Sequence, residues 1–391
     1  MHGQRNILVT CGKGISDILK DEIDSLGYSI TRVNPLSVEV TGDLKDCMIL
    51  NLHLRTANKV LLLIKRFKAS HPDHLYRALS KIPWEDYLST GGYLCVTSHI
   101  QNKHILDTRF GNMKVKDAIV DRIFSQRGRR PDSGPNREQA VIYLHWVDSD
   151  CHIYFDTSGE TISKHGYRKI PYKAPLRESL AAALIKATQW KTDTPLVNPM
   201  AGSGTLAIEA AMMASQRAPG LYRKNFGFMH LKGYQKEEWL ALTNEASDKV
   251  TNDAAAPIIV NDNSLEAIRA AKKNAAWAGV NHLISFRHGD FNKMEMPSAP
   301  GVVILNPGYG TRIGEIKELG STYRMIGDFF KEHCPGFWGY VFTGNPELSK
   351  QIGLRTSRKM AFYNGSIECR LLEYELYLGS KKNSTAHHHK S

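Results

Sequence analysis

Two short stretches carry residue types that suit ligand binding at the end of a β-strand. The first passes from an apolar segment through two glycines into an alanine-rich segment: Leu196-Val197-Asn198-Pro199-Met200-Ala201-Gly202-Ser203-Gly204-Thr205-Leu206-Ala207. This order predicts a strand, a tight loop and a helix. Because Gly202 and Gly204 have no Cβ, a ligand can come close to the amides at the helix N-terminus, which favours a nucleotide-type cofactor.

Two common nucleotide motifs do not fit this loop. The phosphate-binding P-loop has four residues between its glycines and continues as Gly-Lys-Ser/Thr, which is not the case here. The dinucleotide motif Gly-x-Gly-x-x-Gly requires a third glycine where this chain has Ala207. For this stretch alone, a glycine turn that binds nothing remains the alternative.

The second stretch closes another apolar run, Val302 to Leu305. It groups an amide, a proline and an aromatic ring as Asn306-Pro307-Gly308-Tyr309-Gly310. In an open α/β sheet, ligands bind at the carboxyl ends of the strands, where this group would lie. A plain turn is the alternative for these residues in isolation.

A third apolar run, Pro257 to Val260, predicts a buried parallel strand that is followed by Asp262. A carboxylate at that position accepts hydrogen bonds from both hydroxyls of a ribose. The alternative role for Asp262 is a helix N-cap, although Ser264 already offers a cap for the helix predicted at 264–279.

Length and composition limit the class of protein. The chain has 391 residues, enough for two or three domains, and a formal net charge of +12, which suggests a polyanionic partner. No apolar stretch reaches the roughly 18 residues of a membrane span, and the N-terminus lacks a signal peptide, so a cytoplasmic protein is expected. The widely spaced cysteines predict neither a zinc site nor disulfides, and no metal is expected: Cys11, Cys47, Cys95, Cys151, Cys334, Cys369.

The pairing of Asn-Pro-Met-Ala-Gly-Ser-Gly-Thr with a later Asn-Pro-x-Tyr resembles the signatures of S-adenosylmethionine-dependent methyltransferases that modify exocyclic base amines. Over nearly its whole length the chain resembles the THUMP-bearing RNA guanine-N2 methyltransferases, as in the N-terminal module of the bacterial 23S rRNA methyltransferase L family. Those proteins can carry a second methyltransferase domain. This chain ends without one, so a single modification is expected.

The resemblance implies a fold and a domain order. We expect an α/β protein with a Rossmann-like class I methyltransferase sheet that ends in an antiparallel hairpin, at 166–391. A ferredoxin-like domain at 1–68 and a THUMP domain at 69–165 precede it, and the βαββα order of the first segment agrees with this. Ser158–Lys173 is interpreted as a strand and then a linker. Asn364-Gly365 predicts a type I′ turn in the terminal hairpin.

The resemblance also implies site residues. The cofactor S-adenosylmethionine would contact Arg177, Glu178, Asn198, Pro199, Ala201, Gly202, Gly204, Thr205, Asp262, Asn263, Asp290 and Phe291. In this interpretation Asp290 bonds the adenine amino group and Phe291 stacks beside the base. For Arg177 and Glu178 a helix start is an equal alternative.

Arginines in a glycine- and proline-rich loop could bind RNA phosphates, the alternative being a solvated loop: Arg122, Arg127, Arg129, Arg130, Arg137.

The implied mechanism needs no metal and no covalent nucleophile. The side-chain carbonyl of Asn306 and the backbone carbonyl of Pro307 would accept hydrogen bonds from the guanine amine. Tyr309 would stack on a base turned out of its helix. Two residues depart from the family pattern: Gly308 stands where a second proline is usual, and Asn198 where aspartate is usual.

Three alternatives stay open. The substrate would be rRNA by whole-chain resemblance, with tRNA as the competitor. The chain could instead be a degenerate methyltransferase that holds RNA or assists ribosome assembly without turnover, which Gly308 and Asn198 would favour. DNA amine methyltransferases share Asn-Pro-x-Tyr, but the N-terminal RNA module argues against DNA. The terminal histidines, within Ala386–Lys390, are either a tag or a native tail.

Overall fold

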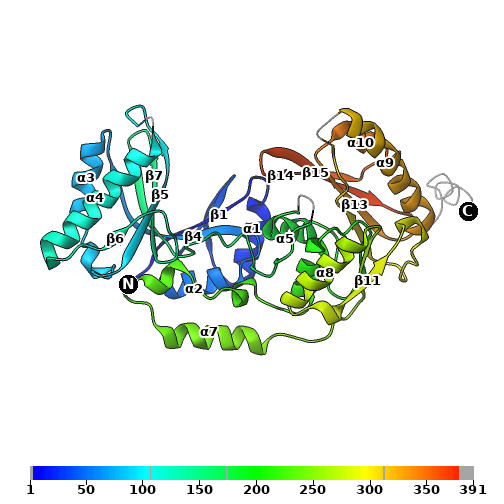
Figure 1. Cartoon of the computed structure of the whole chain (residues 1–391), viewed down its shortest axis with the longest axis horizontal. Helices are drawn as coiled ribbons and strands as arrows, with labels where there is room; N and C mark the ends of the chain where they lie inside the picture. The colour runs from blue at the N-terminus through cyan, green and yellow to red at the C-terminus, as the bar shows by residue number, and fades with distance from the viewer. Residues whose placement is uncertain (1–2, 106, 173–174, 311–312, 378–391) are drawn as a thin grey trace, which may run out of the picture. The chain divides into compact units, whose positions relative to one another are not determined.

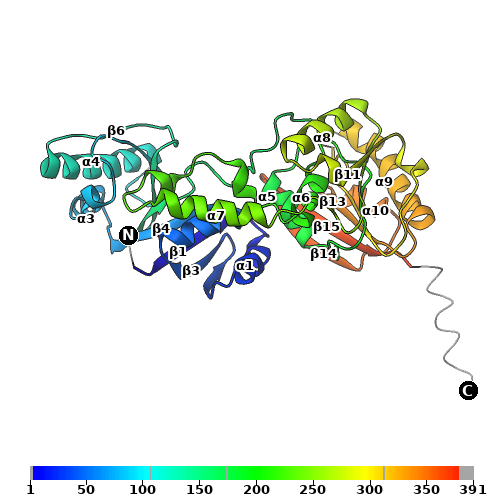
Figure 2. The same ribbon diagram turned by 90° about the horizontal axis from the view of Figure 1, so that it is seen from below.

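The chain folds into two compact units. The computed structural model describes residues 3–105, 107–172, 175–310 and 313–377, without the side chains of 313–317. One unit consists of Met1–Gly12, Leu19–Lys164 and Ala218–Asp248, and the other of Lys13–Ile18, His165–Arg217 and Lys249–Ser391. Each unit is built around its own sheet (Figures 1 and 2).

The sheet of the first unit has eight strands. In spatial order they are β2 (Ile30–Asn34), β3 (Ser37–Gly42), β1 (Arg5–Cys11), β4 (Ala57–Lys68), β8 (Asp150–Asp156), β7 (Ala140–Val147), β5 (Tyr93–Gln101) and β6 (Asp132–Ser133). Along β7, residues 142, 144 and 146 are buried and alternate with the more exposed 143, 145 and 147, the period of two expected for a sheet with one covered face. The pairing of β4 with β8 joins the predicted ferredoxin-like and THUMP segments in one continuous sheet.

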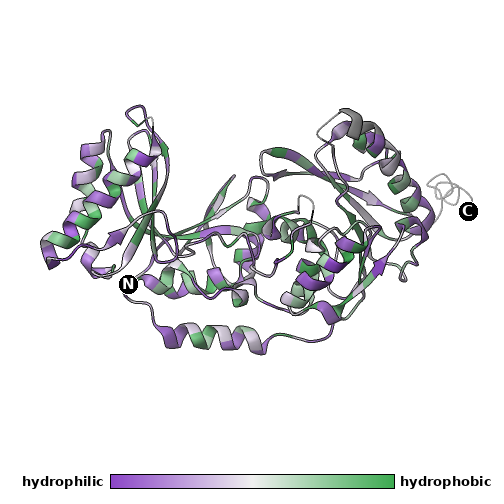
Figure 3. Ribbon diagram, in the orientation of Figure 1, coloured by the Kyte–Doolittle hydropathy of each residue, from purple (hydrophilic) through white to green (hydrophobic). Residues whose placement is uncertain are grey.

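The helices associated with this unit are α1 (Ser16–Ser25), α2 (Leu44–His53), α3 (Pro72–Ser80), α4 (Thr108–Arg127) and α7 (Lys236–Asp248). Helix α4 is preceded by an Asp107 cap and followed by Gly128 in the left-handed conformation. Helix α7 buries only Trp239 and Ala246 and shows mixed hydrophilic and hydrophobic turns in Figure 3. It contacts α2, so this unit includes a segment that the sequence analysis had assigned to the third domain. The predicted domain boundaries themselves stay a prediction.

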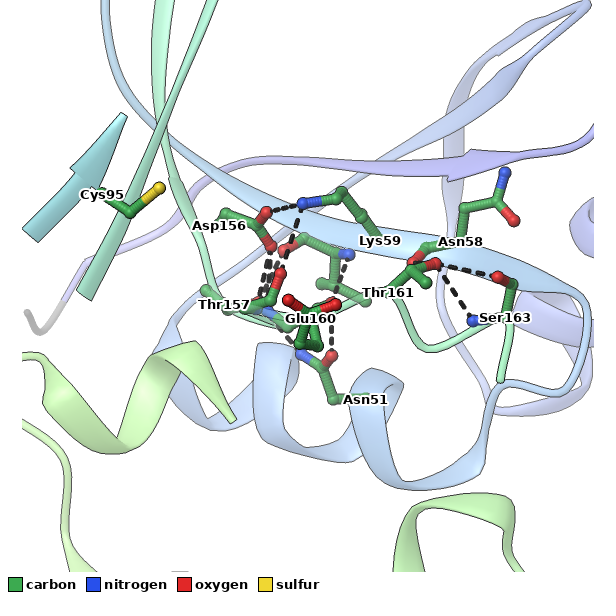
Figure 4. A network of polar contacts seen from close by, with 12 residues as sticks. Asn51, Asn58, Lys59, Cys95, Asp156, Thr157, Glu160, Thr161 and Ser163 are labelled. Carbon is green, nitrogen blue, oxygen red and sulfur yellow. Dashed lines mark hydrogen bonds and ion pairs between the residues drawn. The ribbon is translucent and has the colours of Figure 1, made fainter. Parts of the chain in front are cut away.

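A buried polar network ties α2, β4 and the end of β8 together (Figure 4). The side chain of Asn51 donates to Thr157 Oγ1 (3.0 Å) and accepts from Ser158 Oγ (2.6 Å), and Ser158 Oγ in turn accepts from the amide of Val60 (2.9 Å). Lys59 forms an ion pair with the buried Asp156. The network thus joins α2 and β4 to the residues that directly follow β8.

The prediction of a strand at the start of Ser158–Lys173 is wrong. The amides of Ser158 and Gly159 donate to the Asp156 carboxylate (3.2 and 3.1 Å), and Gly159 has a φ of 74°. Such a side-chain bond to the following amides favours a turn over an extended strand, so the chain turns here.

The sheet of the second unit has seven strands. Their spatial order is β11 (Ile284–His288), β10 (Ile258–Asp262), β9 (Leu196–Asn198), β12 (Val302–Leu305), β13 (Trp338–Thr343), β15 (Ile367–Glu375) and β14 (Arg358–Asn364). The first five are parallel, and β15 runs antiparallel to both β13 and β14. The sheet and its neighbours are covered by α5 (Glu178–Lys186), α6 (Thr205–Ala214), α8 (Leu265–Trp277), α9 (Ile313–His333) and α10 (Pro346–Lys350).

The terminal hairpin confirms the predicted fold, but its turn type was predicted wrongly. The two central residues are Gly365 and Ser366, because Asn364 pairs with Ile367. Only Gly365 has a positive φ, 65°, whereas a type I′ turn needs positive φ at both positions. Glycine at the first central position is the signature of type II′.

Across the described ranges, no helix combines the length and the apolar character needed to cross a bilayer.

Candidate functional site

The carboxyl ends of β9 and β12 meet at the point where the strand order of the second sheet reverses. From β9 the chain proceeds through α6 to β10 on one side, while β12 lies on the other side of β9. Open α/β sheets bind ligands at this position. Asn198 ends β9, and its Nδ2 donates to the Ile304 carbonyl of β12 (2.8 Å). Asn306 follows directly after β12, so the two predicted motifs lie on neighbouring strand ends.

The two glycines of the loop have different roles. Gly204 has a φ of 81°, and a Cβ there would lie 2.9 Å from the Cβ of Ala271, so packing of α6 near α8 requires glycine. Gly202 also has a positive φ, 55°, but a Cβ there would meet no atom within 4 Å. No side chain caps α6, which leaves its first amides to other acceptors. The open side of the loop is therefore at Gly202.

Asp262 holds the loop to the end of β10. Its Oδ2 accepts from the amide of Gly202 and its Oδ1 from the amide of Ser264, both at 2.9 Å. The Ser264 hydroxyl caps α8 by accepting from the amide of Ala267, so the predicted cap is confirmed. Each carboxylate oxygen keeps a further lone pair, so Asp262 can still accept from a ribose hydroxyl. Asn263 is exposed.

Asp290 and Phe291 already have structural partners. The exposed Asp290 accepts from the amide of Asn292 (3.0 Å). Phe291 is only 8% exposed and packs edge-on against Phe329, with ring centroids 5.2 Å apart. Their role beside an adenine stays a prediction.

The segment Asn306–Tyr309 presents a buried acceptor. The Oδ1 atom of Asn306 is buried and has no hydrogen-bond partner among the described residues. Buried polar atoms are normally paired, so this oxygen is available to a donor from outside the described residues. The Gly308 carbonyl accepts from the Tyr323 hydroxyl (3.2 Å), which fixes the backbone next to Pro307.

Tyr309 is held on three sides. Its hydroxyl accepts from Asn364 Nδ2 (3.0 Å), its carbonyl accepts from Asn345 Nδ2 (3.1 Å), and its ring meets Phe342 edge-on. Burial raises the pKa of Tyr309 to about 12, so the phenol is neutral at physiological pH. A neutral, fixed ring suits stacking and not proton transfer.

Sequence reasoning missed Arg168. Its guanidinium forms an ion pair with the buried Glu178 (3.4 Å) and donates to Thr205 Oγ1 (3.3 Å) and to the Leu176 carbonyl. The Nε atom of Arg168 is buried and has no partner in the described part of the chain. Arg168 thus links two predicted cofactor residues, whereas Arg177 is exposed. No periodicity or motif marks an arginine ten positions before its partner.

Glu209 was also missed. It is fully buried on α6 and accepts from His165 Nδ1 (2.8 Å) and from the Tyr167 hydroxyl (2.7 Å) through one oxygen. Burial and the Glu209 carboxylate raise the pKa of Tyr167, so its phenol remains a donor. The second oxygen of Glu209 has no described partner. These contacts hold the start of the segment that leads to Glu178.

The predicted RNA-binding arginines divide into two groups. Arg122 makes a two-point contact with the buried Glu85 (2.6 and 3.2 Å), which holds the pKa of that carboxyl below its usual range, and Arg130 pairs with Asp121 (2.6 Å). Arg127 and Arg129 are exposed, and Arg137 is half-buried. RNA binding by all five stays a prediction, and the exposed pair fits it best.

The glycine loop at the switch point and the antiparallel final hairpin define a Rossmann-like methyltransferase fold. More narrowly, the chain belongs to the family described as RMKL-like, methyltransferase domain, which matches residues 165–373. Residues 6–61 match the RlmL ferredoxin-like domain and residues 69–156 the THUMP domain.

Relatives match over about 95% of the chain. The ribosomal RNA large subunit methyltransferase K/L of Syntrophotalea carbinolica is 35% identical over 377 residues, covering 94% of this chain and 53% of that protein. The chain thus spans about half the length of such relatives. A Synechocystis protein, named as a candidate RNA methyltransferase, is 34% identical over 95% of this chain and 97% of its own length.

The crystal structure of SMU.472, a candidate methyltransferase complexed with SAH, superposes with a TM-score of 0.88 at 26% identity. The superposition covers 97% of this chain and 100% of that one.

Proposed function

We propose that this protein transfers a methyl group from S-adenosylmethionine to the exocyclic N2 of a guanine in 23S rRNA. The observation that carries the proposal is the buried Oδ1 of Asn306, which lacks a described partner at the end of β12. A guanine amine is a poor nucleophile because its lone pair is delocalised into the ring. Acceptors that hold its hydrogens orient that lone pair, and proximity then supplies much of the rate.

The loop fits the cofactor. The open side of Gly202, the uncapped start of α6 and the Asp262 carboxylate form a cradle of donors and acceptors. When bound, S-adenosylmethionine supplies an electrophilic methyl group on a sulfonium. Asp262 would hold the ribose, and Glu178, oriented by Arg168, would border the methionine part. Asn198 carries no charge, so the site lacks the negative charge that an aspartate would add there.

The acceptor side depends on a fixed backbone. Asn306 Oδ1 and the Pro307 carbonyl oxygen would accept hydrogen bonds from the two N–H groups of the guanine amine. Tyr309 would stack on the base. Gly308, which departs from the family pattern, is held by the Tyr323 hydroxyl. This contact supports turnover over the alternative of a degenerate protein that only holds RNA. The names of the rRNA relatives favour rRNA over tRNA.

The test is transfer of labelled methyl groups to total RNA from a strain that lacks the gene, followed by nucleoside analysis. The wild type should place N2-methylguanosine in large-subunit rRNA. The variant Asn306→Ala should form no N2-methylguanosine. The control Asn281→Ala, which changes an exposed asparagine of the same unit, should form it as the wild type does. Label in tRNA would move the substrate to that competitor, and methyladenosine would overturn the guanine assignment. Cofactor binding without label would indicate a protein that holds RNA without modifying it.

A further inference from the structure

Three histidines and an arginine line up across four neighbouring strands of the first sheet. His99 on β5 pairs in register with His145 on β7, which pairs with His152 on β8, which pairs with Arg66 on β4. The rings of His99 and His145 stack at 5.3 Å with an angle of 14°, and those of His145 and His152 lie 6.1 Å apart. We call these four residues the histidine row.

The histidine row lies on the face of the sheet that α4 does not cover. Ile100 of β5 touches α4, because a Cβ at Gly111 would lie 2.3 Å from its Cδ1. Trp146 and Cys151, in register with Ile100, are fully buried. Side chains alternate between the two faces of a sheet, so the neighbouring histidine row points the other way. His99 is exposed, His145 and His152 are half-buried, and the Arg66 side chain is 50% exposed.

The carboxylates nearest to the histidine row are already neutralised. Asp150 pairs with Lys68 (2.5 Å), and Glu39 pairs with Arg66 (3.5 Å). Each of these two carboxylates therefore already balances a cation, which leaves it less able to balance protonated imidazoles as well. An anionic ligand would balance them, and the chain's net charge of +12 favours a polyanion.

Two of the three histidines, His145 and His152, have a pKa below the usual value for histidine, which favours their neutral form when no ligand is bound. Burial, then His99 and His152, lower the pKa of His145. Burial, Arg66 and Lys68 lower the pKa of His152, against the opposing effect of Asp150 and Glu39. A phosphate beside the row favours the charged form and raises these pKa values. Affinity for a polyanion should therefore rise as the pH falls through the pKa values of the complex.

We propose that the histidine row binds the phosphates of a single RNA strand along the open face of the sheet. Three strand spacings give it a length of roughly 14 Å, long enough for more than one phosphate. The proposal rests on the proposed RNA substrate and identifies a second contact surface besides the exposed loop arginines. RNA binding by the histidine row would be proton-linked, whereas binding by arginines would not.

The test measures how RNA affinity depends on pH, using the whole 391-residue chain. Fluorescence anisotropy at low salt would give the Kd for a labelled single-stranded segment of large-subunit rRNA at about pH 8 and about pH 6. The variant His99→Gln/His145→Gln/His152→Gln keeps polar side chains that cannot be charged. The matched control is His74→Gln, since His74 is an exposed histidine of the same unit on α3.

We expect the wild type and the control to bind about tenfold tighter at the lower pH, and the triple variant to lose this gain. Arg66→Gln should weaken binding at both pH values and reduce the salt dependence. Equal affinities and pH slopes for wild type and triple variant would overturn the proposal, as would absence of RNA binding by a wild type that still methylates rRNA. A row that binds RNA in a protein that transfers no methyl group would support this inference and contradict the proposed function.

Discussion

Asn51 and Asn306 are both asparagines with a buried side-chain oxygen, but they are satisfied differently. Asn51 accepts from Ser158 and donates to Thr157 within the first unit, where neighbouring polar atoms are also paired. At the strand ends of the second unit, Asn198 Oδ1 and Asn306 Oδ1 have no described partner, and neither does Oε2 of Glu209 on α6. An unpaired buried polar atom costs about 1–3 kcal/mol. Such atoms also occur in the first unit, at Asn6, Thr97, Ser98 and Asn112. The position of Asn306 at the end of β12, next to the switch point of the sheet, is therefore what distinguishes this candidate ligand site from the structural network.

The largest expected effect comes from removing the unpaired side chain of Asn306. Asn306→Ala should lower kcat by roughly 100- to 1000-fold, the size of effect seen when one polar group that stabilises a transition state is removed. Stability should change by under about 1 kcal/mol, because Oδ1 has no described partner to lose. Methyl-transfer kinetics and thermal unfolding of the full chain measure the two effects. A strong loss of stability with retained kcat would assign Asn306 to the scaffold.

The converse change tests the structural network. Asn51→Ala leaves the Ser158 hydroxyl and the Thr157 side chain with fewer partners in a buried site, so the free energy of unfolding should fall by about 2–3 kcal/mol. Cofactor affinity and kcat of the folded protein should stay near wild type. Asn58→Ala is the matched control, because Asn58 contributes its backbone carbonyl while its side chain points away from the network (Figure 4). Equal destabilisation by both variants would remove the special role of Asn51.

A pair of glycine variants sharpens the contrast inside one loop. Gly204→Ala should cost about 2 kcal/mol of stability, because its φ of 81° is unfavourable for alanine and the new Cβ would crowd Ala271. Gly202→Ala should cost about 1 kcal/mol, from its φ of 55° alone. It should weaken cofactor binding more than Gly204→Ala does, because its Cβ would project into the open side of the loop. Calorimetric titration with S-adenosylhomocysteine would check this, and the reverse ranking would contradict the assignment.

Local patterns predicted much of the second unit. The strand ends at Asn198, Asp262 and Asn306 follow from short apolar runs closed by turn residues, and these are decided by neighbouring positions in sequence. The Ser264 cap was predicted for the same reason. Contacts between positions far apart in sequence could not be predicted from such local patterns. Arg122 was interpreted as a phosphate clamp, but its guanidinium is held by Glu85, a partner that no spacing rule connects to it.

The turn at Gly365 shows the limit of dipeptide signals. Asn364-Gly365 predicted a type I′ turn, yet the register of β14 and β15 places the glycine first in the turn, and register is decided by pairing along both strands. Arg168 and Glu209 are similar cases. Arg168 contacts Thr205 and Glu209 contacts Tyr167 because segments distant in sequence pack together, and neither residue lies in a recognisable motif.

The smallest expected effect concerns Gly308, the residue that departs from the family pattern. It is not among the glycines with positive φ, and a Cβ there would make only ordinary contacts with Leu319 at 3.7 and 3.8 Å. Gly308→Ala should therefore stabilise the protein by about 0.5 kcal/mol through the unfolded chain, with kcat equal to or slightly above wild type. Gly310→Ala is the matched control and should destabilise by about 1 kcal/mol, because Gly310 has a φ of 57°. A large loss of kcat in Gly308→Ala would mean that the backbone between the amine acceptors and Tyr309 must move during turnover. The Tyr323 contact would then describe only one of its states.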